Sequence, residues 1–392
     1  MGDKPVFAYP LFALGFRVFF LLAGLSALVL MALWNAMTHG GLHLANYYPA
    51  EFWFSHELLF GYAAAVIAGC LLSLAQQGQA SVFCTDRLAS LALLWLYGRI
   101  APFYAGLLPD VMIAALDLAF LPALALTVLP VLRRQSGVLP VLALLLLSLL
   151  ALANALLHGQ VLGWSFSGWT QTGELGLKLA ASLWVLALLT VAGEILPTVT
   201  ERALNGVACI RNPLLDMAAI AFSALALILW LLALAGWPLL LAALAALLTN
   251  LLRLSGWLVA RVLYLPLLWV LYFGFAWILL GFLLLALSAY QWLAPTWALQ
   301  AFTLGGLGVS SLGFMARLAL IQSGRVLKAS NIMALAFGLI NIAVILQVLF
   351  AALIPSWLGQ LLGWSVYAWL AAFALFVFSN WSLLLQAQAA KQ

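Results

Sequence analysis

Residues 264–289 read YLPLLWVLYFGFAWILLGFLLLALSA, an apolar run that contains no Asp, Glu, Lys or Arg. About 20 such residues in a helix span the hydrocarbon core of a bilayer. Similar runs recur along the whole chain, which is 67% hydrophobic and only 6% charged, with a mean hydropathy of +1.19. A soluble domain carries roughly 25% charged residues. The sequence therefore predicts an all-α fold, that of a polytopic integral membrane protein surrounded by the lipid bilayer.

Polar and proline-containing breaks divide the chain into about twelve helices of membrane-spanning length. No polar stretch is long enough to fold separately, so we expect residues 1–392 to form a single transmembrane helical domain. The predicted spans are 14–37, 52–76, 88–108, 110–132, 139–158, 175–200, 214–235, 237–260, 264–289, 296–321, 331–354 and 362–385.

The positions of the basic residues predict the orientation, because short cytoplasmic loops retain Lys and Arg. With both termini inside, all of the 15 Lys and Arg except Arg99 and Lys178 fall in inner loops or at the nearer inner helix ends. We therefore predict an N-in, C-in topology. The net charge of +5 does not indicate nucleic acid, since no basic run exceeds the pair Arg133 and Arg134.

This topology puts all four histidines on the outer side. His39 and His43 lie in the first outer loop, His56 starts the second helix and His158 ends the fifth. Histidine is a common ligand for haem, copper and zinc, whereas loop histidines are often only solvated and helix-end histidines often only form a structural hydrogen bond. Glu57 follows His56 directly and points about 100° away from it on a helix. We do not expect these two side chains to hydrogen-bond through adjacency.

Two pairs of charged residues lie at matching depths in the hydrocarbon, where a lone charge is costly. Arg99 is in the outer half of the third helix and Asp117 is about two turns below the outer end of the fourth. The short loop between these helices makes them antiparallel neighbours, so we predict a structural ion pair between Arg99 and Asp117. Glu194 and Arg317, at inner helix ends, are a second candidate pair.

Several stretches of the sequence resemble those of one family in the same order along the chain. They are PLFALGFRVFF at residues 10–20, SHELLFGYAAAVIAG at 55–69, LDLAFLP at 116–122, LANALLH at 152–158 and GEILPTVT at 193–200. The chain resembles a divergent member of the NnrS family, membrane proteins tied to nitric oxide and to haem and copper.

The resemblance implies a multi-pass protein of the bacterial cytoplasmic membrane that takes part in the response to nitric oxide or nitrosative stress. His56 and His158 match family histidines, so they are the expected ligands of haem or another metal at the outer face, with nitric oxide as a candidate ligand. At other positions, where the family has histidine, this chain has Asn250, Tyr272, Gln300 and Gln322. Because amide oxygen is a weak donor for copper, we do not expect a copper site.

Two other functions also fit the sequence. Twelve helices with glycine-rich segments suit a secondary transporter or permease, although no repeat between the halves is evident. A family member without metal that serves as an accessory membrane subunit is the third alternative. The sequence identifies no catalytic residue, and it leaves open whether the protein is an enzyme.

Overall fold

The structure is a computed structural model that describes residues 10–42, 46–75, 83–164 and 171–385. These residues are almost entirely helical and contain no β-strand. Eleven helices within them are long and apolar enough to cross a membrane. The prediction of an all-α, multi-pass membrane fold is therefore confirmed.

The expected span at 88–108 is shorter than predicted. Its α-helix, α4, covers Thr85–Ile100 in 16 residues and continues as a single 3₁₀ turn, η3, over Ala101–Tyr104. Pro102 in the second position of that turn has no N–H to donate to a continuing α-helix. The count of twelve spans and the N-in, C-in orientation stay predictions.

Contacts divide the chain into two compact units. Unit 1 contains the described residues up to Ala180, together with 318–326 and those from Val377 onward. Unit 2 contains Ala181–Arg317 and Leu327–Phe376. Three helices, α8 (Thr172–Ala203), α13 (Ser310–Gln322) and α16 (Leu358–Leu385), have residues in both units. That the chain is a single domain stays a prediction.

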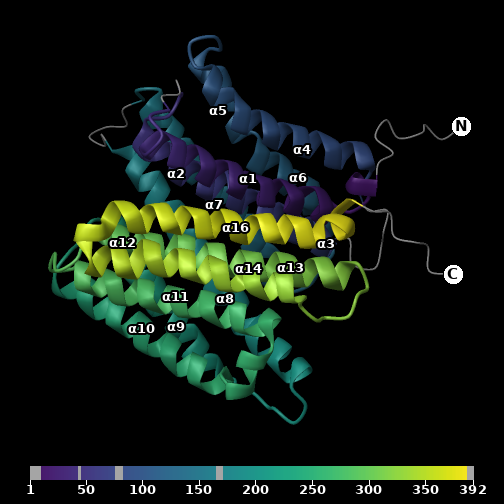
Figure 1. The fold of residues 1–392 in the computed structure, drawn as a ribbon, viewed down its shortest axis with the longest axis vertical. Coiled ribbons are helices and arrows are strands. Elements are labelled where there is room, and N and C mark those ends of the chain that lie inside the picture. The colour runs from purple at the N-terminus through teal and green to yellow at the C-terminus, as the bar shows by residue number, and fades with distance from the viewer. Residues whose placement is uncertain (1–9, 43–45, 76–82, 165–170, 386–392) are drawn as a thin grey trace, which may run out of the picture. The chain divides into compact units, whose positions relative to one another are not determined.

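Besides α4 and η3, unit 1 contains η1 (Pro10–Ala13), α1 (Gly15–Thr38), α2 (Ala50–His56), η2 (Glu57–Tyr62), α3 (Ala63–Ala75), α5 (Asp110–Leu118), α6 (Phe120–Leu132) and α7 (Leu139–Val161). The helix α1 packs along the continuous helical segment formed by α2, η2 and α3, while α5 and α6 contact α4 and α7 (Figure 1). The segment η2 is a π-helix between two α-helices.

The elements that lie wholly in unit 2 are α9 (Pro213–Leu231), α10 (Trp237–Trp257), η4 (Ala260–Tyr264), α11 (Pro266–Ser288), α12 (Pro295–Gln300), η5 (Ala301–Val309), α14 (Asn331–Val344), η6 (Ile345–Phe350), α15 (Ala351–Leu353) and η7 (Pro355–Trp357). The helix α10 packs between α9 and α11, and α11 packs against the buried π-helix η5. The helices α9, α10 and α11 run side by side in Figure 1.

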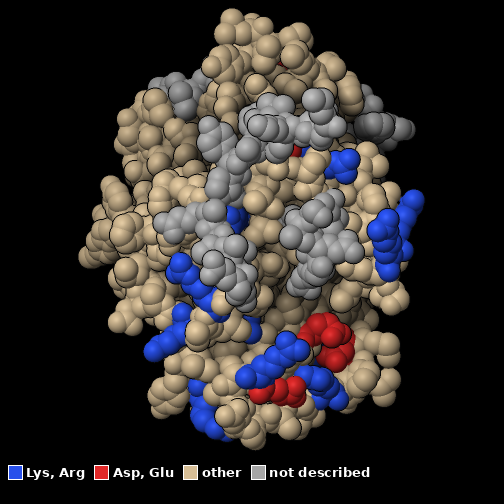
Figure 2. All heavy atoms as spheres, turned by 90° about the vertical axis from the view of Figure 1, so that its right-hand side faces the viewer, with Lys and Arg blue, Asp and Glu red and all other residues tan. Residues whose placement is uncertain are grey.

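The outer surfaces of both units are rich in large apolar side chains, such as the exposed Leu126, Leu241 and Phe350. In water such a surface would be unstable, whereas lipid solvates it well. Charged side chains are sparse on the face that Figure 2 shows, and acidic and basic side chains lie together in its lower part. A surface ion pair of unit 2 joins Arg211 Nη2 to Glu201 Oε2 at 2.7 Å. The chain is accordingly built to lie in a lipid bilayer.

Candidate metal centre

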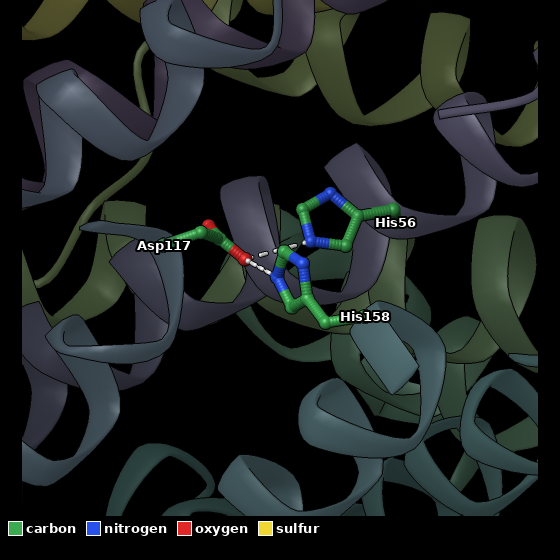
Figure 3. Close-up of side chains that lie close together, drawn as sticks. All are labelled: His56, Asp117 and His158. Atoms are coloured by element: carbon green, nitrogen blue, oxygen red, sulfur yellow. Dashed lines mark hydrogen bonds and ion pairs between the residues drawn. The ribbon is translucent and has the colours of Figure 1, made fainter. Parts of the chain in front are cut away.

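Three side chains of unit 1 converge on one point inside the protein. His56, Asp117 and His158 each offer a potential ligand atom, and these atoms lie within 4.8 Å of one another. All three residues are buried. Figure 3 shows both imidazoles directed at the Asp117 carboxylate. Two imidazoles and one carboxylate are a donor set that can bind a metal ion.

Each of the three residues stands near the end of its helix. His56 is the last residue of α2, just before the π-helix η2, and π-helical insertions are frequent at functional sites. Asp117 is the penultimate residue of α5, and His158 lies in the last turn of α7. Three separate elements of unit 1 therefore supply the cluster.

One oxygen of Asp117 contacts both histidines. Its Oδ2 lies 3.0 Å from Nε2 of His56 and 3.0 Å from Nε2 of His158. The two ring centroids are 6.0 Å apart. The structure thus brings together the two histidines that the sequence singled out as ligands, with an acidic side chain between them.

The second polar atom of each of the three residues is held by another side chain. Glu57 Oε1 lies 3.3 Å from His56 Nδ1, and the Tyr47 hydroxyl lies 3.1 Å from His158 Nδ1. Arg99 Nη2 forms an ion pair with Asp117 Oδ1. Such outer contacts fix the orientation of metal ligands and the tautomer of ligating histidines. They leave both Nε2 atoms and Asp117 Oδ2 facing the common centre.

Arg99 links two carboxylates. Besides its contact with Asp117, its Nη1 lies 3.1 Å from Glu57 Oε1, and all three side chains are at most 11% exposed. One guanidinium and two carboxylates leave the cluster with one net negative charge when both histidines are neutral. An uncompensated charge is costly in such a setting, so the cluster favours an added cation.

The contact between His56 and Glu57 corrects a sequence expectation. Adjacency on a helix was expected to keep the two side chains apart, but they lie within hydrogen-bond distance. The expectation was wrong because Glu57 begins the wider π-helix and its side chain is held by Arg99 on the same side. Since a neutral imidazole carries one proton, it cannot donate to Glu57 and Asp117 at once. If its proton lies on Nδ1, Nε2 can accept a hydrogen bond from the Tyr48 hydroxyl or bind a metal ion.

Three further polar residues belong to the cluster and were missed from the sequence. The Tyr48 hydroxyl lies 2.9 Å from His56 Nε2, and Asn154 Nδ2 donates to Asp117 Oδ2 at 2.8 Å. Tyr47 is the third. Asn154 could have been found, because it is one helical turn from His158 and shares its face. The two tyrosines lie in a loop, where no periodicity reveals the direction of a side chain.

Burial raises the pKa of both tyrosines. The pKa of Tyr48 is raised well above its usual value, and that of Tyr47 is raised as well. Their hydroxyl groups can therefore donate a proton to histidine nitrogen as well as accept one.

The remaining predicted residues lie elsewhere. His39 is exposed at the end of α1, with Nδ1 2.8 Å from Thr38 Oγ1, and His43 falls outside the described residues. In the part of the chain that the structure describes, no ion pair joins Glu194 to Arg317. That candidate pair was wrong.

Unit 2 has its own buried charge, Arg253 on α10. Its Nε donates to Asp216 Oδ1 at 2.6 Å, and its Nη1 donates to Asn250 Oδ1 at 3.1 Å. The guanidinium also lies over the Trp257 ring, 4.9 Å from its centroid. Asn250 stands where the family resemblance implies histidine, and here it hydrogen-bonds Ser223 and Arg253. This position has become part of a structural network.

Comparison with known proteins identifies the family. The family model described as NnrS protein matches residues 10–388, which is nearly the whole chain. No curated protein matches the chain. The chain therefore belongs to the NnrS family.

Proposed function

From this family membership and the geometry of unit 1, we propose that the protein is a membrane metalloprotein of the nitric oxide response that binds one metal ion through His56, Asp117 and His158. The observation that carries the proposal is the convergence of three ligand atoms within 4.8 Å, each ligand also being held by a second side chain. The net negative charge of the cluster with neutral histidines also supports the proposal, because a bound metal ion neutralises it.

Ferrous iron is the ion that this donor set favours. Two histidines and one carboxylate form the ligand set of non-haem iron(II) sites, which keep open positions for small molecules. Nitric oxide binds ferrous iron as such a molecule. The proposed role in the nitric oxide response rests on the family resemblance, and the cluster supplies a place where the ligand can bind.

A haem held between His56 and His158 does not fit the cluster. Asp117 Oδ2 is within 3.0 Å of both Nε2 atoms, and the Tyr48 hydroxyl is 2.9 Å and 3.2 Å from them. These atoms fill the space that the porphyrin plane would occupy between opposed imidazoles. The space suits a single ion, and the haem implied by the resemblance has no place between these two ligands.

Metal analysis of the purified protein tests the proposal. The detergent-solubilised protein is loaded anaerobically with Fe²⁺, freed of unbound metal and assayed for iron. We expect one iron per chain, which is lost in His56→Ala and in His158→Ala but kept in the control His39→Ala, because His39 is exposed outside the cluster. Addition of nitric oxide should produce the electron paramagnetic resonance signal of a ferrous nitrosyl complex.

Two results would contradict the proposal. Iron binding that is unchanged in both cluster variants would place the metal elsewhere, and a Soret band that depends on His56 and His158 would show a haem instead. Failure of the wild-type protein to bind any metal would favour the metal-free accessory subunit.

A further inference from the structure

The loop before α2 brings a fourth donor atom to the cluster. The Tyr48 hydroxyl oxygen lies 2.9 Å from His56 Nε2, 3.2 Å from His158 Nε2 and 3.5 Å from Asp117 Oδ2. It is thus close to all three proposed ligand atoms at once. A hydroxyl has a single proton, so it can donate to only one of these three neighbours.

The four atoms are spaced as neighbouring ligands of one metal ion are. Ligands at about 2.0–2.1 Å from an ion are separated by about 2.9 Å at right angles and by about 3.3–3.4 Å at tetrahedral angles. The contacts of the Tyr48 hydroxyl and of Asp117 Oδ2 run from 2.9 Å to 3.5 Å, so the fourth donor fits beside the three proposed ligands. Asn154 also faces the cluster, with Oδ1 3.2 Å from His56 Nε2 and Nδ2 2.8 Å from Asp117 Oδ2, but these contacts use two different atoms, whereas the single Tyr48 oxygen contacts all three ligand atoms.

The position of Tyr48 is fixed by its surroundings. Its ring stacks on the His56 ring, with centroids 4.2 Å apart, and packs edge-on against Tyr47 at 4.9 Å. Its backbone N–H donates to Asn46 Oδ1 at 2.9 Å, and the N–H of Tyr47 donates to the carbonyl of Pro102 at 2.9 Å. The residue is buried. Its hydroxyl is therefore held at the cluster by contacts that involve no metal.

Charge balance favours the phenolate form once a divalent ion is bound. Arg99, Glu57 and Asp117 together contribute one negative charge, so a divalent ion with neutral tyrosine leaves one positive charge. Loss of the phenol proton to solvent makes the site neutral. A neutral site is the least costly one in surroundings of low polarity.

We propose that Tyr48 is the fourth ligand of the metal and binds it through its phenolate oxygen. This inference rests on the proposed metal site and names the ligand that completes it. On binding, the metal–oxygen bond replaces the O–H bond of the phenol, and the proton leaves to solvent. The hydroxyl of the neighbouring Tyr47 contacts the far nitrogen of His158, Nδ1, and has an orienting role.

The two tyrosines offer a matched pair of variants. Tyr48→Phe and Tyr47→Phe each remove one hydroxyl and keep the ring, so the packing around His56 and His158 is preserved. Wild type and both variants are loaded with Fe²⁺, freed of unbound metal and oxidised to the Fe³⁺ state. Iron content and visible absorption are then measured on the same samples.

A phenolate bound to Fe³⁺ gives a visible charge-transfer band, which neither histidine nor carboxylate ligands produce. We expect this band in the wild type and in Tyr47→Phe, and its loss in Tyr48→Phe. Tyr47→Phe should weaken iron binding by roughly 10–100-fold, as loss of an outer contact does, without removing the band.

The results separate this inference from the proposed function. Wild-type protein that holds one iron dependent on His56 but shows no band would overturn the role of Tyr48 alone. A band that survives in Tyr48→Phe would do the same. Wild-type protein that holds no iron would overturn both proposals.

Discussion

The two buried charge clusters, around Asp117 in unit 1 and around Arg253 in unit 2, differ in net charge. Arg253 has one carboxylate partner, and its donors find acceptors on Asp216, Asn250 and the Leu189 carbonyl. Around Asp117, two carboxylates share a single guanidinium, and each imidazole contacts a carboxylate. The first set is neutral, whereas the second keeps one negative charge when both histidines are neutral and so favours an added cation.

Burial and short distances alone therefore do not distinguish a binding site from a structural ion pair. Both clusters contain a buried residue with close charged partners. The net charge of each cluster makes the distinction, because a buried negative charge that the protein does not neutralise favours binding of a proton or a metal ion. The predictions below test this difference, from the largest expected effect to the smallest.

Removing the Asp117 charge should have the largest effect. Asp117→Asn leaves Arg99 without one of its two carboxylate partners and replaces one of the two oxygens that Arg99 and the histidines use with an amide NH2 group. Breaking a buried ion pair costs about 3–5 kcal/mol, so the free energy of unfolding should fall by that amount, together with loss of iron binding. Unfolding in detergent measures the first effect and iron content the second. Asp110→Asn, at the exposed start of the same helix, is the control, and equal losses in the two variants would contradict the prediction.

Glu57→Gln tests the outer contacts of the metal cluster. The amide keeps the size of the side chain but loses the carboxylate that faces His56 Nδ1 and Arg99. We expect metal affinity to fall roughly 10–100-fold, as for other outer partners of metal ligands. Titration with Zn²⁺ in competition with a chelator measures the affinity. The half-exposed Glu174 provides the control Glu174→Gln, and an affinity equal to that of the control would show that Glu57 does not orient His56.

Asp216→Asn makes the corresponding change in unit 2. Its side chain is 35% exposed, and asparagine can still accept a hydrogen bond from Arg253, so we expect a loss of about 1–2 kcal/mol in the free energy of unfolding. Iron content should not change, because this neutral cluster lies outside the proposed metal site. Loss of iron in this variant would break the comparison between the two units.

How much of this the sequence reveals depends on helix periodicity. Apolar runs locate the spans, and counting residues from helix ends puts Arg99 and Asp117 at similar depth. The same counting applied to the hairpin of α9 and α10 would have put Asp216 near Arg253, a pair that we did not predict. The same counting places His56 and His158 at similar depth near the predicted outer ends of their helices.

Periodicity fails where the chain leaves the α-helix. Tyr48 lies in a loop that two hydrogen bonds anchor. The N–H of Tyr48 donates to the Asn46 side chain, and the N–H of Tyr47 donates to the Pro102 carbonyl. Neither contact has a sequence signature. Glu57 lies in a π-helix, where the angle between successive side chains differs from that of an α-helix. The short span at α4 was overestimated because apolar residues continue through its 3₁₀ turn. The missed features are therefore those that tertiary contacts decide.

The smallest effect is expected at the ion pair of Lys178 and Glu174, which shows that short distance is a poor guide to energy. Lys178 Nζ lies 2.7 Å from Glu174 Oε1, much as Arg253 lies close to Asp216, yet the lysine and glutamate side chains are 23% and 50% exposed. Exposed pairs four residues apart on a helix contribute about 0.3–0.5 kcal/mol, because both charges remain partly solvated when apart. Glu174→Gln should therefore lower the free energy of unfolding by no more than this in the unfolding assay used for Asp117→Asn, and the loss should shrink further in high salt. A loss as large as that of Asp216→Asn would mean that distance, and not burial, sets the energies of the ion pairs in this protein.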